Sequence, residues 1–155
     1  MPFQETLEET QIRHLNLPSP NVLSPTISIR SAIKHMRKVK CACGLVVKNE
    51  KLIGIVTERD VMNKVVGRPE MVGRQIREIM TPNPVTLGPD NSLDDAIELM
   101  SRGGYRNVPI IDDENRAIAS LNVHQILQFI LENFPQDANN LPPRPEQQIP
   151  TPEGA

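Results

Sequence analysis

The chain has 155 residues and a net charge of −2, with 38% apolar and 23% charged residues. This size allows one ordinary domain or two small fused halves, and the near-neutral charge argues against a protein that grips nucleic acid by its phosphates. The pattern of a signal peptide is missing, no apolar run approaches the roughly 20 residues that span a bilayer, and two cysteines make no disulfide framework, so we expect a cytoplasmic protein.

The first half of the chain predicts a short strand, a helix, a two-stranded hairpin and a second helix. The helix prediction rests on Ile29, Ile33 and Met36, which recur at helical spacing, and the hairpin on two apolar runs around a polar turn at 48–51. In chain order we expect a helical segment within 1–17, a strand at 22–23, a helix at 28–37, strands at 45–47 and 52–56, and a helix at 57–66.

The second half of the chain predicts the same elements after a linker. We expect a linking helix at 72–80, a strand at 85–87, a helix at 92–101, strands at 108–111 and 117–121, and a helix at 122–133. The residues from Pro135 onward are rich in proline and poor in apolar side chains, which is typical of a disordered or extended tail.

The order β-α-β-β-α therefore occurs twice, and the sequence itself is repeated. Ala32 and Met36 return as Ala96 and Met100, 64 positions later. A doubled unit of this kind predicts two copies that pack as a pseudo-symmetric pair with an α+β fold. We divide the chain into a helical segment (1–17), two repeats (18–68 and 82–134), a linking helix (69–81) and a proline-rich tail (135–155).

A chemical motif, Gly-Ile-Val-Thr-Glu-Arg-Asp, covers residues 54–60 at the end of the second hairpin strand. A carboxylate such as Asp60 can accept hydrogen bonds from both cis hydroxyls of a ribose. The Thr57 hydroxyl, beside helix N–H groups, suits a phosphate or the other edge of the ribose, and Gly54 would leave room for a ligand to approach the strand. The same Thr-x-x-Asp spacing also fits a helix capping box, so both interpretations stay open.

The second copy differs at this motif. Asn122 and Gln125 replace the threonine and the aspartate, and both residue types can still cap a helix. Gln125 has no charge with which to hold a ribose diol, and Ala119 replaces the glycine. We therefore expect one competent site per chain, and at most a weaker second site at Asn122, His124 and Gln125.

The doubled unit, together with the position of this motif, resembles a pair of CBS domains, the module named for cystathionine β-synthase, over roughly residues 18–134. The resemblance implies a pseudo-two-fold pair, a disc-like homodimer, and a regulatory rather than catalytic role. It also implies an adenosine-containing regulatory ligand (AMP, ADP, ATP or S-adenosylmethionine) bound between the repeats, no required cofactor, and an effector protein as partner.

The resemblance further implies that Thr57, Arg59 and Asp60 of the motif face the other repeat across a cleft. The residues expected on the opposite side are Asn83, Pro84, Val85, Tyr105, Arg106, Asn107 and Val108. Arg106 would neutralise a phosphate or remain a solvated loop arginine, and Tyr105 would stack on adenine or cover the rim of the cleft.

Other candidate sites carry less weight. Cys41 and Cys43, with His35 nearby, are too few for a zinc site and fit small buried hydrophobes, so we expect no metal. A basic stretch between Arg30 and Lys40 could meet nucleic acid, although a solvated helix face is its ordinary role. No motif of an enzyme is present. The alternatives to ligand sensing are an assembly dimer that binds no nucleotide and a nucleic-acid-binding CBS protein.

Overall fold

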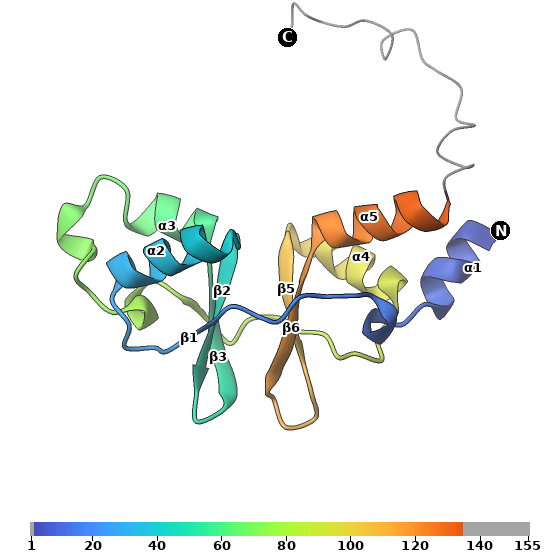
Figure 1. The fold of residues 1–155 in the computed structure, drawn as a ribbon, viewed down its shortest axis with the longest axis horizontal. Coiled ribbons are helices and arrows are strands. Elements are labelled where there is room, and N and C mark those ends of the chain that lie inside the picture. Colours follow the sequence, from blue (N-terminus) through green and yellow to red (C-terminus); the bar gives the residue numbers. More distant parts are fainter. Residues whose placement is uncertain (1, 135–155) are drawn as a thin grey trace, which may run out of the picture.

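The computed structural model describes residues 2–134; the predicted tail (135–155) lies outside this range. Its two halves lie side by side, with their hairpins adjacent at the centre and their helices towards the outside (Figure 1). Among residues 2–134, no helix combines the length and the apolar composition needed to cross a bilayer.

The first half contains the predicted elements. They are β1 (Val22–Leu23), α2 (Ile29–Val39), β2 (Cys43–Lys48), β3 (Lys51–Thr57) and α3 (Glu58–Lys64). The strand β1 pairs with β2 in parallel, and β2 pairs with β3 in antiparallel fashion. The hairpin turns tightly because Asn49 and Glu50 both adopt left-handed φ values, 52° and 66°, as in a type I′ turn. Ser28 caps α2 by accepting a hydrogen bond from the Ser31 amide at 3.1 Å.

The second half repeats this arrangement. It contains α4 (Leu93–Gly103), β5 (Asn107–Ile111), β6 (Ala117–Asn122) and α5 (Val123–Asn133). The parallel pairing of Leu23 with Val46 recurs as a bridge between Leu87 and Ile110. Both hairpins also have a register shift at the same place, directly after Val46 and directly after Ile110. The tandem α+β repeat predicted from the sequence is therefore confirmed.

The linking helix predicted at 72–80 was wrong. Two short 3-10 helices, η2 (Pro69–Met71) and η3 (Ile76–Glu78), replace it. The cause is non-local pairing: the Ile29 amide donates to the Arg74 carbonyl, and the Ile76 amide donates to the Ile27 carbonyl. Those bonds hold the linker extended around residues 74–76, so its backbone groups are not available for an α-helix.

One predicted strand and the predicted N-terminal helix also have different limits in the structure. The strand expected at 85–87 is reduced to the single bridge at Leu87, and the linker instead forms β4 (Thr81–Pro82), antiparallel to β3. Prolines at 82, 84 and 89 lack the N–H that a longer ladder needs. The N-terminal helix α1 (Pro2–Glu9) ends earlier than expected, and a separate 3-10 helix, η1 (Ile12–His14), follows it.

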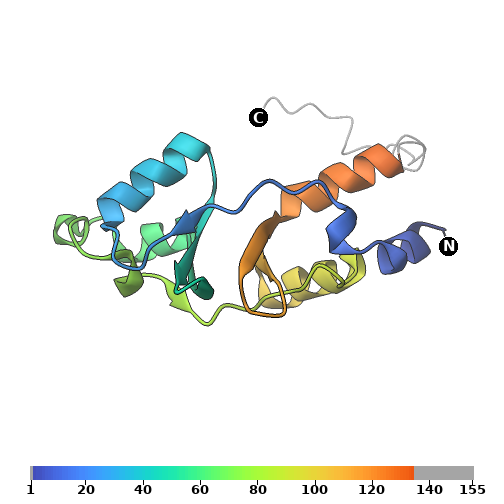
Figure 2. The ribbon, with the colours of Figure 1, turned by 60° about the horizontal axis from the view of Figure 1, so that its bottom comes forward.

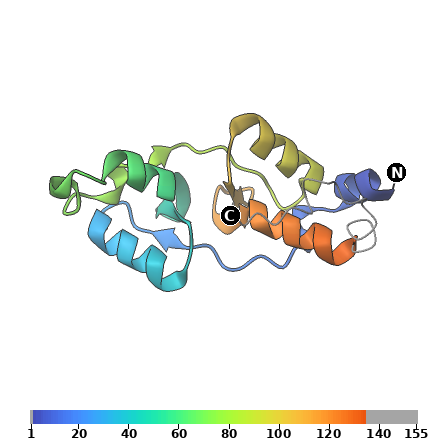
Figure 3. The ribbon, with the colours of Figure 1, turned by 90° about the horizontal axis from the view of Figure 1, so that it is seen from above.

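The core of each half includes residues from the segment that leads into the other half. Leu7 and Ile12, from the start of the chain, belong to the core of the second half with Leu93 and Leu121. The chain then crosses to the first half and returns through the linker, and these two crossing segments run on opposite sides of the molecule (Figures 2 and 3). The halves are therefore interlocked rather than strung in series.

A small apolar cluster joins the two hairpins at the centre. Cys43, Leu45, Leu52 and Ile55 are buried there, packed against Ile111 and Ala117 of the second half. Hydrogen bonds reinforce this seam, because the Leu52 amide donates to the Asn115 carbonyl at 2.9 Å and the Asn115 side chain donates to the Leu52 carbonyl at 3.1 Å. The relative position of the halves is thus held at the hairpins.

Candidate functional site

A cleft of about 420 Å³ lies where the two repeats meet, and both repeats and the linker contribute to its wall. The first repeat and β4 supply Ala42, Ile55, Thr57, Glu58, Arg59, Asp60 and Thr81. The segment after β4 and the second repeat supply Asn83, Pro84, Val85, Gly104, Tyr105, Arg106, Asn107 and Pro109. The fold thus brings the 54–60 motif opposite residues that lie more than twenty positions away in the sequence.

Thr57 and Asp60 form a helix cap and also line this cleft. Oδ2 of Asp60 accepts hydrogen bonds from the Thr57 amide at 2.9 Å and from the Thr57 hydroxyl at 3.2 Å. The Asp60 amide in turn donates to the Thr57 hydroxyl oxygen at 3.4 Å, which completes a capping box at the start of α3. The capping interpretation is confirmed, and it leaves both side chains on the wall of the cleft.

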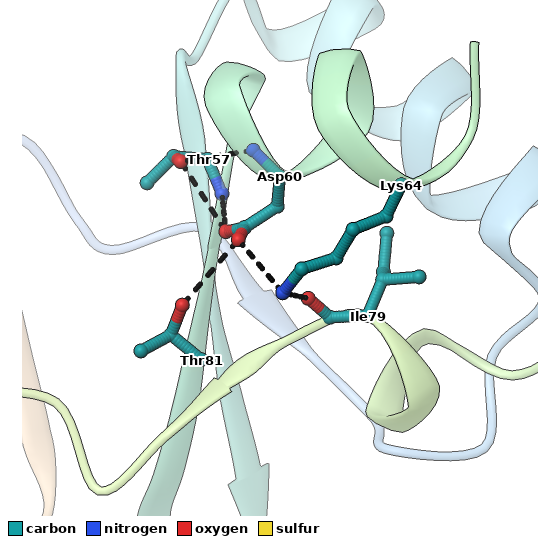
Figure 4. Close-up of polar contacts among 5 residues, drawn as sticks. All are labelled: Thr57, Asp60, Lys64, Ile79 and Thr81. Atoms are coloured by element: carbon teal, nitrogen blue, oxygen red, sulfur yellow. Dashed lines mark hydrogen bonds and ion pairs between the residues drawn. The ribbon is translucent and has the colours of Figure 1, made fainter.

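The other oxygen of the carboxylate has two further donors (Figure 4). Oδ1 of Asp60 accepts from the Lys64 ammonium at 3.2 Å and from the Thr81 hydroxyl at 3.3 Å. Lys64 also donates to the Ile79 carbonyl at 2.8 Å. Neither Lys64 nor Thr81 was predicted. The spacing of Asp60 and Lys64, four residues apart on one helix, is a signal for the first, whereas Thr81 arrives only through the pairing of β4 with β3.

Six of the seven residues expected across the cleft from the motif line this cleft. Asn83, Pro84 and Val85 follow β4, and Tyr105, Arg106 and Asn107 lead into β5. A Cβ atom added to Gly103 would lie 2.0 Å from Cε2 of Tyr105, so the absence of a side chain at Gly103 lets the tyrosine ring fold over the end of α4. Their contact with a ligand stays a prediction.

Gly54 and Val108, by contrast, do not line the cleft. A Cβ atom at Gly54 would lie 2.4 Å from Sδ of Met80, so this glycine makes room for the linker rather than for a ligand. Val108 is fully buried in the core of the second half. Side chains alternate along β5, which turns Asn107 and Pro109 towards the cleft and Val108 away from it.

In the second copy, Asn122 and Gln125 serve as a cap. Oε1 of Gln125 accepts from the Asn122 amide at 2.7 Å, and Oδ1 of Asn122 accepts from the His124 amide at 2.8 Å. The capping expected for this copy is confirmed. Asn122, His124 and Gln125 are absent from the wall of the 420 Å³ cleft, and a weaker second site stays a prediction.

One of the two cysteines, Cys43, lies at the seam between the hairpins. Cys43 is buried, with its Sγ 3.3 Å from Oγ of Ser120 in the second repeat, and this burial raises the pKa of its thiol to about 11. Within residues 2–134, no three His, Cys, Asp or Glu side chains gather as a metal site. A neutral, buried thiol behaves as a small hydrophobe.

Comparison with known proteins identifies the repeats. The model of the CBS domain matches residues 12–67 and 76–132. Inosine-5′-monophosphate dehydrogenase of Methanocaldococcus jannaschii is 34% identical over 119 residues, which are 76% of this chain and 23% of that enzyme. The CBS domain-containing protein CBSCBSPB3 of Arabidopsis thaliana is 30% identical over 68% of this chain and 19% of its own length. The chain thus spans less than a quarter of these two relatives.

Solved structures share the fold. The CBS domain protein NE2398 has a TM-score of 0.72 at 26% identity, covering 79% of this chain and 98% of its own. The CBS domain pair of protein MJ0100, in complex with 5′-methylthioadenosine and S-adenosyl-L-methionine, has a TM-score of 0.69 at 27% identity, covering 78% and 99%. PAE2072 of Pyrobaculum aerophilum, complexed with AMP, matches in fold at 20% identity, with a TM-score of 0.69 over 79% and 98%.

One assignment follows from the repeated sequence, the interlocked halves and the matches of the family model to both repeats. This chain belongs to the CBS domain family and contains a tandem pair of CBS domains.

Proposed function

We propose that this chain is a regulatory module that binds an adenosine-containing ligand, such as AMP, ADP, ATP or S-adenosylmethionine, in the cleft between its repeats. One observation carries the proposal. The cleft places the acidic motif of one repeat, at Thr57 and Asp60, opposite apolar and basic residues of the other, at Val85 and Arg106.

The wall of the cleft suits each part of such a ligand. The Asp60 carboxylate is an acceptor for the two ribose hydroxyls. Ile55, Pro84 and Val85 offer apolar surface for a base, while Arg59 and Arg106, both exposed at the rim, offer positive charge for a phosphate or a carboxylate.

The bound ligands of solved CBS pairs support this assignment. The MJ0100 domain pair, which is 27% identical, is complexed with 5′-methylthioadenosine and S-adenosyl-L-methionine. A ligand that touches both repeats favours whichever relative orientation of the repeats it fits better. The proposed role is therefore regulatory and not catalytic, it requires no cofactor, and its output goes to an effector protein.

We place a homodimer contact on the helices of the same module. Large apolar side chains are exposed on or just after α2, α3 and α5, namely Val39, Met62, Val66, Leu127 and Leu131. Exposed patches of large apolar side chains mark interaction surfaces. Light scattering of the wild type and of Met62→Glu tests this part: a dimer that becomes a monomer supports it, and a wild-type monomer contradicts it.

Calorimetric titration and thermal-shift measurements with AMP, ADP, ATP and S-adenosylmethionine test the ligand. The expected result is saturable binding with one ligand per chain, and stabilisation by about 2.7 kcal/mol at a free ligand concentration of 100 Kd. The matched control is 2′-deoxy-AMP, which lacks one of the two hydroxyls and should bind more weakly than AMP. If none of the four ligands binds, the chain is an assembly module and the proposal fails.

A further inference from the structure

The carboxylate proposed to hold the ribose is already saturated with donors. A carboxylate has about four lone-pair positions, and Asp60 fills them with the Thr57 amide, the Thr57 hydroxyl, the Lys64 ammonium and the Thr81 hydroxyl. A ribose diol needs two acceptor positions on this group. A bound ligand must therefore displace donors that the chain itself provides.

The two edges of the carboxylate differ in how readily they can be vacated. The hydrogen bond that the Thr57 amide donates to Oδ2, at 2.9 Å, belongs to the cap of α3. Its loss would leave a backbone N–H at the start of the helix without an acceptor. The donors on Oδ1 are longer, at 3.2 and 3.3 Å. Oδ1 is thus the edge at which a ligand would exchange.

Lys64 and Thr81 contribute unequally to the barrier at this edge. The Thr81 hydroxyl can rotate and serve as an acceptor instead. Lys64 carries a full charge, and its ammonium is fixed in place by a second acceptor, the Ile79 carbonyl, at 2.8 Å. The Asp60 side chain is only 11% exposed while that of Lys64 is 42% exposed, so the ion pair is partly shielded from water on the acidic side.

We propose that Lys64 is the residue that sets ligand affinity in this chain, because its ammonium competes with the ribose hydroxyls for Oδ1 of Asp60. This inference rests on the proposed function and adds a competitor inside the binding site. The same side chain joins α3 to the linker at Ile79, two residues before Thr81. Displacement of Lys64 from Asp60 would thus change a contact of the segment that leads to Asn83 and the opposite wall of the cleft.

The test is calorimetric titration with 5′-methylthioadenosine, a neutral nucleoside that has the ribose diol and no phosphate. Lys64→Met keeps the aliphatic stem and removes the charge, and we expect it to bind this nucleoside about 3–10-fold more tightly than the wild type. Lys64→Arg keeps the charge and should show no gain. Circular dichroism and thermal melting establish that each variant is folded.

A second measurement compares how salt affects binding in the wild type and in Lys64→Met. Salt screens the partly exposed ion pair, so raising the ionic strength should tighten binding of the neutral nucleoside to the wild type. Lys64→Met should show a smaller salt effect, which separates release of the ion pair from the general effect of salt on apolar binding.

The outcomes distinguish the two proposals. Tighter binding by Lys64→Met, together with the larger salt effect in the wild type, supports the competition. Equal or weaker binding by a folded Lys64→Met, or equal salt effects in the two proteins, overturns it while leaving the proposed function intact. Absence of binding in the wild type and in both variants overturns the inference and the proposed function together.

Discussion

The two repeats build the same strand-to-helix corner with different chemistry. In the first, Thr57 and Asp60 cap α3, and in the second, Asn122 and Gln125 cap α5 through the same reciprocal pair of bonds. The cap needs only two polar side chains, each of which can accept a hydrogen bond from a backbone amide at the start of the helix. The neutral pair Asn122 and Gln125 is sufficient for this. The cap therefore does not need the negative charge of Asp60, which is instead used in the contacts with Lys64 and Thr81.

The difference between the copies extends beyond the charge. Asp60 has two further donors, Lys64 from α3 and Thr81 from the linker, and it lines the cleft. Asn122 instead donates its side-chain amide to Oδ1 of Asn107 at 2.8 Å. Asn107 lines the cleft beside the first motif, so the second motif positions a residue of the cleft wall.

The largest effect should follow from making the first corner like the second. Asp60→Gln introduces the residue that already caps α5, so the fold should be retained. Loss of a hydrogen-bond acceptor with full charge is worth roughly 1.5–3 kcal/mol, which predicts about 10–100-fold weaker binding of AMP in calorimetry.

The control for this substitution is Asp95→Asn, which alters the acid of the capping box on α4, away from the cleft. It should leave AMP affinity unchanged. If Asp60→Gln binds AMP as tightly as Asp95→Asn does, the charge of Asp60 has no role in the site.

A second substitution that makes the first repeat like the second is Gly54→Ala, since the second repeat has Ala119 at the matching position. The new methyl group would meet Sδ of Met80 at 2.4 Å and the Thr81 carbonyl oxygen at 3.2 Å. Overpacking of this kind costs about 1–3 kcal/mol, measured as a lower midpoint of urea unfolding. A change below 0.5 kcal/mol would show that the linker is free to move away from β3.

The caps themselves should be of similar strength. Thr57→Ala and Asn122→Ala each remove an N-cap acceptor, and each should lower the free energy of unfolding by about 1 kcal/mol. Thr57→Ala should weaken AMP binding more than Asn122→Ala does, because Thr57 lines the cleft itself whereas Asn122 reaches it only through its hydrogen bond to Asn107. Equal loss of affinity in the two variants would contradict the assignment of one competent site.

The smallest effect at neutral pH concerns the thiols. Burial raises the pKa of Cys43 from 9.0 to about 11, so the native protein keeps this thiol neutral. Its contribution to stability is complete below pH 9 and is lost as the pH rises from about 9 to 11, since the unfolded chain ionises first. At pH 8, iodoacetamide should therefore add once, at Cys41, in the native protein and twice after denaturation, as read by intact mass spectrometry.

Some of the site was predictable because it depends on local pattern. The motif at Thr57 and Asp60 lies at a strand-to-helix junction that hydrophobic periodicity places within one or two residues. The second copy could be aligned to it, which identified Asn122 and Gln125 as a cap without an acid. Asn83 and Arg106 were placed only through the family resemblance, because no local signal joins them to Asp60.

Other parts were wrong or absent for a common reason. Gly54 was assigned to a ligand, but Met80 fills the space beside it. The segment around Ile76 has helical spacing, yet its amide pairs with Ile27 across the chain. Thr81 carries no motif of its own. Each case depends on which distant strand or linker the backbone pairs with, and periodicity along the chain does not encode that choice.

The amino-acid sequence by itself determined the duplication, the element order of each repeat and the difference in charge between the two motifs, because these follow from short-range spacing and residue type. Only the tertiary structure decided what surrounds the one acidic motif. Pairing of β4 with β3 delivers Thr81 to Asp60 and sets Ile79 beside Lys64, and packing of the repeats closes a cleft whose two walls come from segments that meet only once the chain has folded.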